Sequence, residues 1–242
     1  MDAIKRHWDI RSSDYNDFVV RGFSIDRERR SWQEHFTSIL GSEPLDILDV
    51  GCGPGIVSMQ LADLGHRMTS VDLSDRMLEY ARENASANGF DIDFLQADAM
   101  GLPFEDDSFD AVVSDYMLWT VPEPRKVISE WYRVLKPGHV LVYTDGDWFT
   151  DPRMTSLRCT VSSFFVRMEK GRPKDDVERE EAQLDLWSAH ANRPADDIRM
   201  LEEAGFTDIR VIDNVQRKVL HGTRYLAHGL TNNHFTVTAV KP

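Results

Sequence analysis

Three glycines at alternate positions, Gly51, Gly53 and Gly55, connect the short run Ile47–Val50 to an amphipathic stretch. Glycine lets the backbone turn sharply and lets a ligand approach it closely. A helix that follows such a turn presents unpaired N–H groups and the positive end of its dipole. The pattern therefore predicts a loop that holds either the pyrophosphate of a dinucleotide or the amino-acid half of S-adenosylmethionine. An ordinary tight turn is the alternative.

Asp72 ends the next apolar run, 21 residues after Gly51. A carboxylate at that point accepts hydrogen bonds from both hydroxyls of a ribose. The alternative is that Asp72 caps the helix that begins near Ser74. The Gly-x-Gly-x-Gly spacing differs from the Gly-x-Gly-x-x-Gly fingerprint of nicotinamide enzymes, although Asp72 alone fits both cofactors.

Asp98 distinguishes between S-adenosylmethionine and a nicotinamide dinucleotide as the predicted cofactor. It lies in the segment Gln96–Met100, directly after a third short strand. We expect its carboxylate to accept a hydrogen bond from the adenine amine, while the backbone N–H of Ala99 or Met100 faces the ring. A nicotinamide enzyme does not usually need a carboxylate there, so S-adenosylmethionine is the cofactor predicted. A solvated loop aspartate is the alternative.

These segments, together with Leu102–Asp110 and Arg133–Gly138, resemble class I S-adenosylmethionine-dependent methyltransferases. The nearest branch is the small-molecule one that includes the ubiquinone- and menaquinone-biosynthesis type. The resemblance covers residues 45–145 closely and the last strands loosely. It implies that the three glycines shape the methionine pocket, that Asp72 holds the ribose and that Asp98 contacts the adenine.

Other cofactor candidates flank these motifs. The segment Trp8–Tyr15 resembles the opening of the same family, in which an aromatic ring often covers the methionine end of the cofactor, so Tyr15 is one candidate. Met77 fits adenine contact and plain core packing equally, and Cys52 is better interpreted as a small spacer than as a reactive thiol. The remaining candidates are Asp49, Leu73, Ala99, Met100 and Ser114.

The end of the fourth strand, residues 114–119, faces the reacting methyl group in this family. We expect Tyr116 and Trp119 to line the acceptor pocket there, with Trp187 contributed from further along the chain; simple packing is the alternative. The sulfonium is already an activated electrophile, so the protein mainly aligns the acceptor and excludes water. No catalytic residue is assigned. Several side chains are conceivable proton acceptors, namely Asp115, Tyr116, Asp145, Asp147 and His190.

The composition narrows the classes of partner. Lys and Arg number 28 against 41 Asp and Glu, giving a formal net charge of −13, which disfavours a broad phosphate-binding surface. Residues 114–119 also lack the Asn/Asp-Pro-Pro-Tyr/Phe sequence of base methyltransferases, so nucleic acid is disfavoured as substrate. Cys52 and Cys159 show no metal-ligand spacing and no redox motif. Without a signal peptide or an apolar run of membrane-spanning length, the cytoplasm is the expected location; the oligomeric state stays open.

The elements that must position these residues alternate between strands and helices from Leu45 onward. Short, nearly all-apolar strands predict an α/β fold with a Rossmann-like sheet, mostly parallel with an antiparallel edge strand, and helices on both faces. We expect a single methyltransferase domain, 1–242. It comprises a helical N-terminal segment (1–43), a cofactor-binding core (44–146), a helical insertion that acts as a lid (147–195) and a final helix with strands (196–242).

Two other functions remain open. One is a non-catalytic protein that binds S-adenosylmethionine as a sensor or partner subunit. The other is an NAD-dependent oxidoreductase, which both the glycine spacing and Asp98 disfavour.

Overall fold

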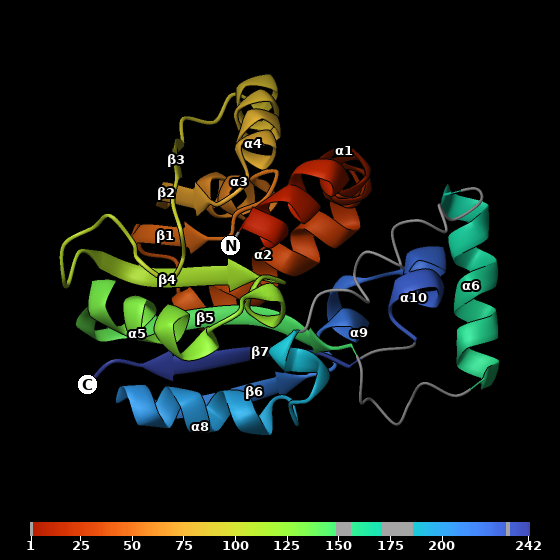
Figure 1. Cartoon of the computed structure of the whole chain (residues 1–242). Helices are drawn as coiled ribbons and strands as arrows, with labels where there is room; N and C mark the ends of the chain where they lie inside the picture. The colour runs from red at the N-terminus through yellow and green to blue at the C-terminus, as the bar shows by residue number, and fades with distance from the viewer. Residues whose placement is uncertain (1, 149–155, 171–185, 231–232) are drawn as a thin grey trace.

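The computed structural model describes residues 2–148, 156–170, 186–230 and 233–242. A seven-stranded sheet runs through these residues in the order β3-β2-β1-β4-β5-β7-β6 (Figure 1). The strands are β1 (Asp46–Val50), β2 (Arg67–Asp72), β3 (Asp93–Gln96), β4 (Phe109–Asp115), β5 (Leu135–Asp147), β6 (Thr207–Asp213) and β7 (Asn233–Val240).

The predicted fold class is confirmed. Strands β1 to β5 pair in parallel, whereas β7 runs antiparallel to both of its neighbours, β5 and β6. The antiparallel strand therefore lies one position inside the edge strand β6. The chain winds outward from β1 in both directions, so the carboxyl ends of β1 and β4 border the crevice where ligands bind in open α/β sheets.

Helices cover both faces of the sheet (Figure 1). They are α1 (Asp2–Phe23), α2 (Asp26–Leu40), α3 (Ile56–Asp63), α4 (Asp75–Asn88), α5 (Pro124–Val134), α6 (Ser156–Lys170), α8 (Ala195–Ala204), α9 (Gln216–Val219) and α10 (Gly222–His228). Two short 3₁₀ turns, η1 (Leu118–Thr120) and η2 (Trp187–Ala189), lie between the longer elements.

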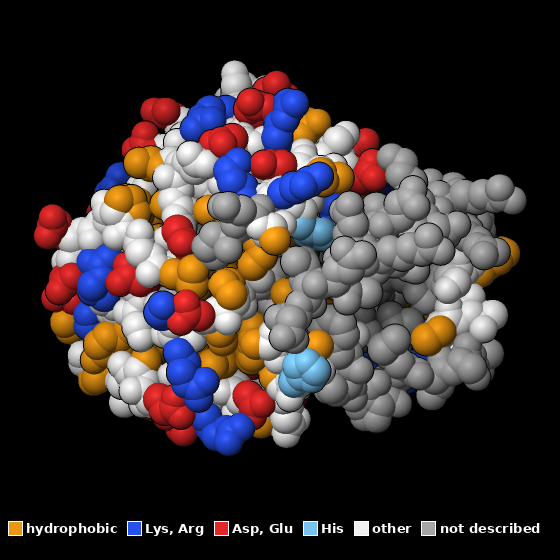
Figure 2. Space-filling model, in the orientation of Figure 1, with side chains coloured by type: hydrophobic (Ala, Val, Ile, Leu, Met, Phe, Trp, Pro, Cys, Tyr) orange, Lys and Arg blue, Asp and Glu red, His pale blue; other side chains and the backbone are white. Residues whose placement is uncertain are grey.

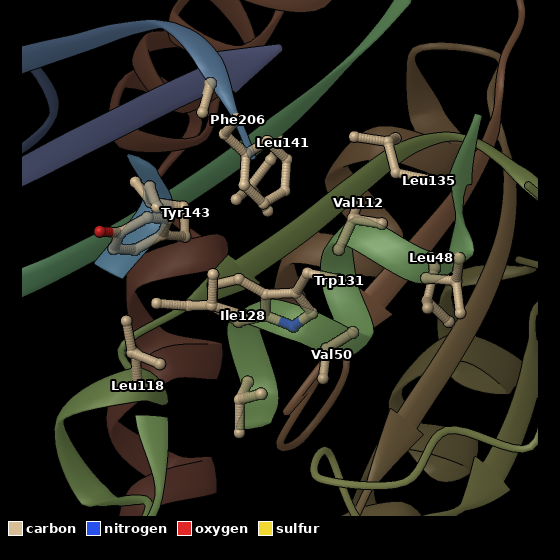
Figure 3. Packing of buried hydrophobic residues seen from close by; sticks show 14 of the residues in the cluster. Leu48, Val50, Val112, Leu118, Ile128, Trp131, Leu135, Leu141, Tyr143 and Phe206 are labelled. Atoms are coloured by element: carbon tan, nitrogen blue, oxygen red, sulfur yellow. The ribbon is translucent and has the colours of Figure 1, made fainter. Parts of the chain in front are cut away.

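Neighbouring residues of β1 point to opposite faces, as the two-residue period of a strand requires. Leu48 joins a buried cluster with Trp131 of α5 and Met200 of α8, part of which is shown in Figure 3. Ile47 joins a second cluster with Phe36 of α2 on the other face. The sheet is thus buried on both sides, which holds its carboxyl edge in a fixed position.

The helix expected to begin near Ser74 forms as α4, and local groups close both of its ends. The Ser74 hydroxyl accepts a hydrogen bond from the Met77 N–H at 3.1 Å, and Gly89 ends α4 in the left-handed conformation with φ +76°. Both are the usual solutions for unpaired groups at helix ends. They set where α4 begins relative to Asp72.

The segment 147–195 is described in part. Its first helix, α6, packs beside α10, which sequence analysis did not anticipate (Figure 1). Much of the expected connection around 170–173, and most of the second helical stretch, lie outside the described residues. The last part of the segment, around η2, returns to the sheet edge and contacts η1.

The described part of the surface mixes both signs of charge. On the face in Figure 2, Lys and Arg side chains lie among Asp and Glu side chains. Within the described ranges, no helix has both the length and the hydropathy needed to cross a bilayer.

Candidate functional site

The glycine loop lies at the carboxyl end of β1, beside β2. The backbone N–H groups of Gly51 and Cys52 both donate to the Val71 carbonyl, at 2.8 and 3.0 Å. Gly51 adopts φ +74°, a conformation that favours glycine. A Cβ at this position would also overlap the Met117 side chain. Glycine is therefore required at this position, because the Met117 side chain packs directly against the loop backbone.

The Asp72 carboxylate joins this loop to the start of α4. Its Oδ2 accepts from the Gly53 N–H, and its Oδ1 accepts from the Ser74 N–H, both at 2.8 Å. Ser74, not Asp72, supplies the side-chain cap of α4. Asp72 is half-buried, so its carboxylate keeps part of its surface at the sheet edge.

Two carboxyl groups under the loop have raised pKa values. Burial, the largest cause, raises the pKa of Asp72 to about 6 and that of Asp49 to about 7. The Ser58 hydroxyl donates to Asp49 Oδ2 at 2.5 Å, whereas Oδ1 has no hydrogen-bond partner among the described residues. Each of the two carboxyls thus holds its proton to a higher pH than an exposed aspartate does.

The candidates for the adenine end follow β2 and β3. Asp98 Oδ1 accepts from the Met100 N–H at 2.9 Å and shapes the turn after β3. Ala99 and Met100 are half-buried and pack against the core, and Leu73 lies half-buried at the end of β2. Met77 is only 2% exposed, so core packing accounts for its side chain.

Tyr15 reaches the loop from α1. Its Cε1 lies 3.5 Å from the position of a Cβ on Gly53, so the ring covers the loop. Burial raises the pKa of the Tyr15 phenol, which stays protonated at neutral pH. Burial likewise raises the pKa of the Cys52 thiol, and a protonated thiol is a poor nucleophile. The structure gives Cys52 the features of a small spacer.

The last residues of β4 differ in their contacts. The Ser114 hydroxyl donates to the Val50 carbonyl at 2.7 Å and ties β4 to β1. The Asp115 carboxyl accepts no hydrogen bond from a described residue, and its Oδ1 is buried. Tyr116 has a left-handed backbone, φ +53°, and its hydroxyl lies 2.7 Å from His234 Nδ1.

Six rings form a continuous aromatic array over this edge: Tyr15, Trp8, Trp119, Trp148, Tyr116 and His234. Trp8 lies 5.6 Å from Tyr15 and 6.5 Å from Trp119, measured between ring centroids. Trp148 lies 5.8 Å from Trp119 and 5.8 Å from Tyr116, and 5.0 Å from His234. The array connects α1 with the ends of β4 and β5 and with the beginning of β7.

A buried ion network is connected to the aromatic array through Trp119. Arg193 Nη2 lies 3.0 Å from Asp145 Oδ2 and 2.6 Å from Asp197 Oδ2, with all three side chains at most 1% exposed. Asp145 Oδ2 also accepts from the Trp119 N–H at 3.0 Å. Trp187 donates from Nε1 to the Leu118 carbonyl at 2.9 Å. The segment 186–197 is therefore fixed to η1.

Four residues of this region were not predicted from the sequence: Trp148, His234, Arg193 and its partner Asp197. Trp148 directly follows the strand end where candidate residues were sought, so its position was a usable signal. His234 reaches the site only because antiparallel pairing sets it opposite Gly146. Arg193 lies between two short helical elements, and no local pattern marks it as a partner of Asp145.

Comparison with known families and structures agrees with this architecture. The family model described as "Methyltransferase domain" matches residues 48–143. The demethylmenaquinone methyltransferase of Renibacterium salmoninarum is 35% identical over 141 residues, which cover 58% of this chain and 56% of that protein. That of Thermus thermophilus is 38% identical over 155 residues, covering 63% of this chain and 69% of that protein.

The chain spans about half the length of the first of these relatives. Among solved structures, the [4+2]-cyclase SpnF superposes with a TM-score of 0.65 and 22% identity, covering 99% of this chain and 96% of that one. At that identity the likeness concerns the fold alone.

Proposed function

Because this chain belongs to the class I S-adenosylmethionine-dependent methyltransferase family, we propose that it transfers a methyl group from S-adenosylmethionine to a small-molecule acceptor. One observation carries the proposal. The Asp72 carboxylate bridges the glycine loop and the start of α4, at 2.8 Å from each N–H, while Tyr15 covers the same loop. This arrangement combines bare backbone, a carboxylate and a ring at one crevice.

The proposed cofactor pocket has three parts. The backbone of Gly51, Gly53 and Gly55, with Tyr15 packed over Gly53, is proposed to contact the methionine half. Asp72 accepts hydrogen bonds from the ribose, and Asp98 with the Ala99–Met100 backbone contacts the adenine. The remaining candidates border these parts from the adjoining strands, loop and helix; they are Asp49, Cys52, Leu73, Met77 and Ser114.

When bound, S-adenosylmethionine supplies a methyl group that is already activated by its sulfonium. The residues of this chain then have to hold the acceptor in line and keep water away from it. The aromatic array, which includes Tyr116 and Trp119, suits both tasks because its rings form an apolar wall. Trp187, hydrogen-bonded to Leu118 at 2.9 Å, is the proposed acceptor-side residue of the 186–197 segment.

For the acceptor we propose a quinone precursor in its reduced, hydroxyl-bearing form. Two relatives are demethylmenaquinone methyltransferases by name. A wall of aromatic rings beside several aspartates also favours a flat, uncharged ring over an anion. The net charge of −13 also disfavours nucleic acid as the acceptor, because its phosphates would be repelled.

A two-step experiment tests this function. S-adenosylhomocysteine should raise the Tm of the protein by mass action, whereas NAD should not. Protein incubated with methyl-tritiated S-adenosylmethionine and a reduced short-chain demethylmenaquinone should then produce a labelled quinone. A Tm rise with NAD alone would support the oxidoreductase, and strong cofactor binding without transfer to any quinol would support a sensor.

A further inference from the structure

The Asp115 carboxyl is the least hydrogen-bonded of the buried acids of the site that the structure describes. Its Oδ1 is buried, yet no described residue donates a hydrogen bond to it. Asp72 accepts two backbone hydrogen bonds and Asp145 is paired with Arg193. Asp49, whose Oδ1 also lacks a partner, accepts from Ser58 at its Oδ2. A buried polar atom without a partner is destabilising, and native structures contain few of them. Its retention here points to a ligand that supplies the missing donor.

The position of Asp115 indicates which ligand. Asp49 of β1 is paired with Val113 of β4, so the parallel register brings Asp115 alongside Gly51 of the loop. The next residue, Tyr116, belongs to the aromatic array and reaches His234 of β7 at 2.7 Å. Asp115 therefore lies between the proposed cofactor loop and the rings proposed to hold the acceptor.

We propose that Asp115 is the catalytic base that accepts the proton of the acceptor's hydroxyl group during methyl transfer. This assignment rests on the proposed function. As the ring carbon beside the hydroxyl-bearing carbon forms its bond to the methyl carbon, the carbon–sulfur bond breaks and its electron pair returns to sulfur. The hydroxyl proton passes to the Asp115 carboxylate. The products are the ring-methylated keto tautomer, the neutral thioether and a protonated carboxyl; the keto tautomer then returns to the quinol by moving its ring proton to oxygen, so charge and atoms balance.

The surroundings of Asp115 raise its affinity for a proton. Burial raises the pKa of Asp115 well above its usual value, and Asp49 of β1 and Asp145 of β5 add to the shift. Tyr116, directly after β4, and Tyr15 of α1 also face it, and burial raises both of their pKa values, so both stay neutral. A raised pKa makes the ionised Asp115 carboxylate a stronger proton acceptor than an exposed aspartate.

A binding experiment tests the assignment without requiring turnover. The protein saturated with S-adenosylhomocysteine is titrated with 1-naphthol and with 1-methoxynaphthalene, which lacks the hydroxyl proton, and tryptophan fluorescence is followed. Wild type should prefer the naphthol by at least about tenfold, because a charge-assisted hydrogen bond forms to Asp115. This preference should rise with pH as Asp115 ionises.

Asp115→Asn should abolish both the preference and its rise with pH while leaving S-adenosylhomocysteine affinity within about threefold. Asp115→Glu, which keeps the carboxyl, should restore part of the preference. The matched control is Asp93→Asn, which changes an exposed aspartate at the start of β3, and it should behave as wild type. If Asp115→Asn fails to fold, the Glu variant and Asp115→Ser are compared in the same way.

Three outcomes would overturn the assignment. One is an unchanged naphthol preference in Asp115→Asn. Another is that wild type binds neither 1-naphthol nor 1-methoxynaphthalene, which would mean that the aromatic array does not form a binding site. The third is a loss of S-adenosylhomocysteine affinity without a change in preference, which would assign the carboxyl to the cofactor's ammonium group. Failure of the proposed function itself would look different, because wild type would then either not bind S-adenosylhomocysteine or bind it without transferring a methyl group to any quinol.

Discussion

Arg193 and Asp145 form an ion pair at 3.0 Å in which neither side chain is more than 1% exposed. Asp145 holds the N–H of Trp119, and the Arg193 guanidinium lies 5.0 Å from the centroid of the Trp187 ring. One buried cation thus connects the end of β5, η1 and η2. This connection fixes the distance between the two tryptophans proposed to face the acceptor.

Removing that cation should strongly destabilise the fold. Arg193→Met leaves Asp145 and Asp197 buried without their partner, so we expect a loss of about 3–5 kcal/mol in the free energy of unfolding. Urea denaturation followed by circular dichroism measures it. Arg199→Met, on an exposed arginine of α8, should change stability by less than about 1 kcal/mol. Equal losses in both variants would contradict the role of the network.

Asp72→Ala should weaken cofactor binding by roughly 2–4 kcal/mol, because a charged acceptor for two ribose hydroxyls is lost. Calorimetric titration with S-adenosylhomocysteine measures the affinity. Asp72→Asn is the companion variant, because its amide oxygen still accepts one backbone hydrogen bond while the charge is gone. A folded Asp72→Ala protein with wild-type affinity for S-adenosylhomocysteine would show that Asp72 has a purely structural role.

Asp49 should make stability depend on pH. Burial raises its pKa to about 7 in the folded state from 3.8. Its contribution to stability is therefore complete at low pH and is lost as pH rises from about 4 to about 7, by up to about 4 kcal/mol. Asp72, whose pKa rises to about 6, acts in the same direction.

Asp49→Asn should flatten this dependence, since the amide oxygen can still accept from Ser58. Unfolding free energies at a series of pH values, for wild type and for Asp49→Asn, provide the comparison. A variant as steeply pH-dependent as wild type would show that another group controls this range.

Trp187→Ala should impair methyl transfer while leaving S-adenosylhomocysteine affinity within about threefold, a difference below about 1 kcal/mol. The reason is that Trp187 contacts η1 through Leu118 and is assigned no cofactor contact. Trp187→Phe separates the ring from its N–H donor. Parallel loss of cofactor binding and turnover would mean that the residue supports the whole site.

Gly51→Ala should disrupt the loop more than its backbone conformation alone explains. Gly51 and Gly65 both adopt positive φ, but a Cβ on Gly51 overlaps Met117, whereas nothing lies within 4 Å of one on Gly65. Gly65→Ala should therefore show only the backbone strain, about 1–2 kcal/mol. Thermal melts of the two variants should differ clearly, and equal melts would contradict the predicted overlap.

The parts of the site that sequence predicted are those with local causes. The strand–glycine–helix turn, the Ser74 cap and the Asp72 position each depend on residues close together in the chain. The mostly parallel sheet was also predicted, because strand–helix alternation leaves few arrangements.

What sequence did not predict depends on distant pairings. His234 meets Tyr116 across 118 residues, and Arg193 meets Asp145 across 48. The helices α9 and α10 are too short to produce a periodic pattern. Met77 shows a further limit, since its spacing fitted adenine contact and core packing equally, and only its burial in the fold favours packing.

The place of β7 has a consequence for how the chain is made. In the sheet, the edge strand β6 pairs with β7, although β7 is synthesised after it. While a ribosome is still adding residues before 233, β6 has no strand to pair with, and the edge of β5 exposes unpaired backbone N–H and C=O groups. Such an edge is a template for pairing with other chains. Arrested translation products ending before β7 should therefore aggregate or recruit chaperones, whereas chains completed through Val240 should not.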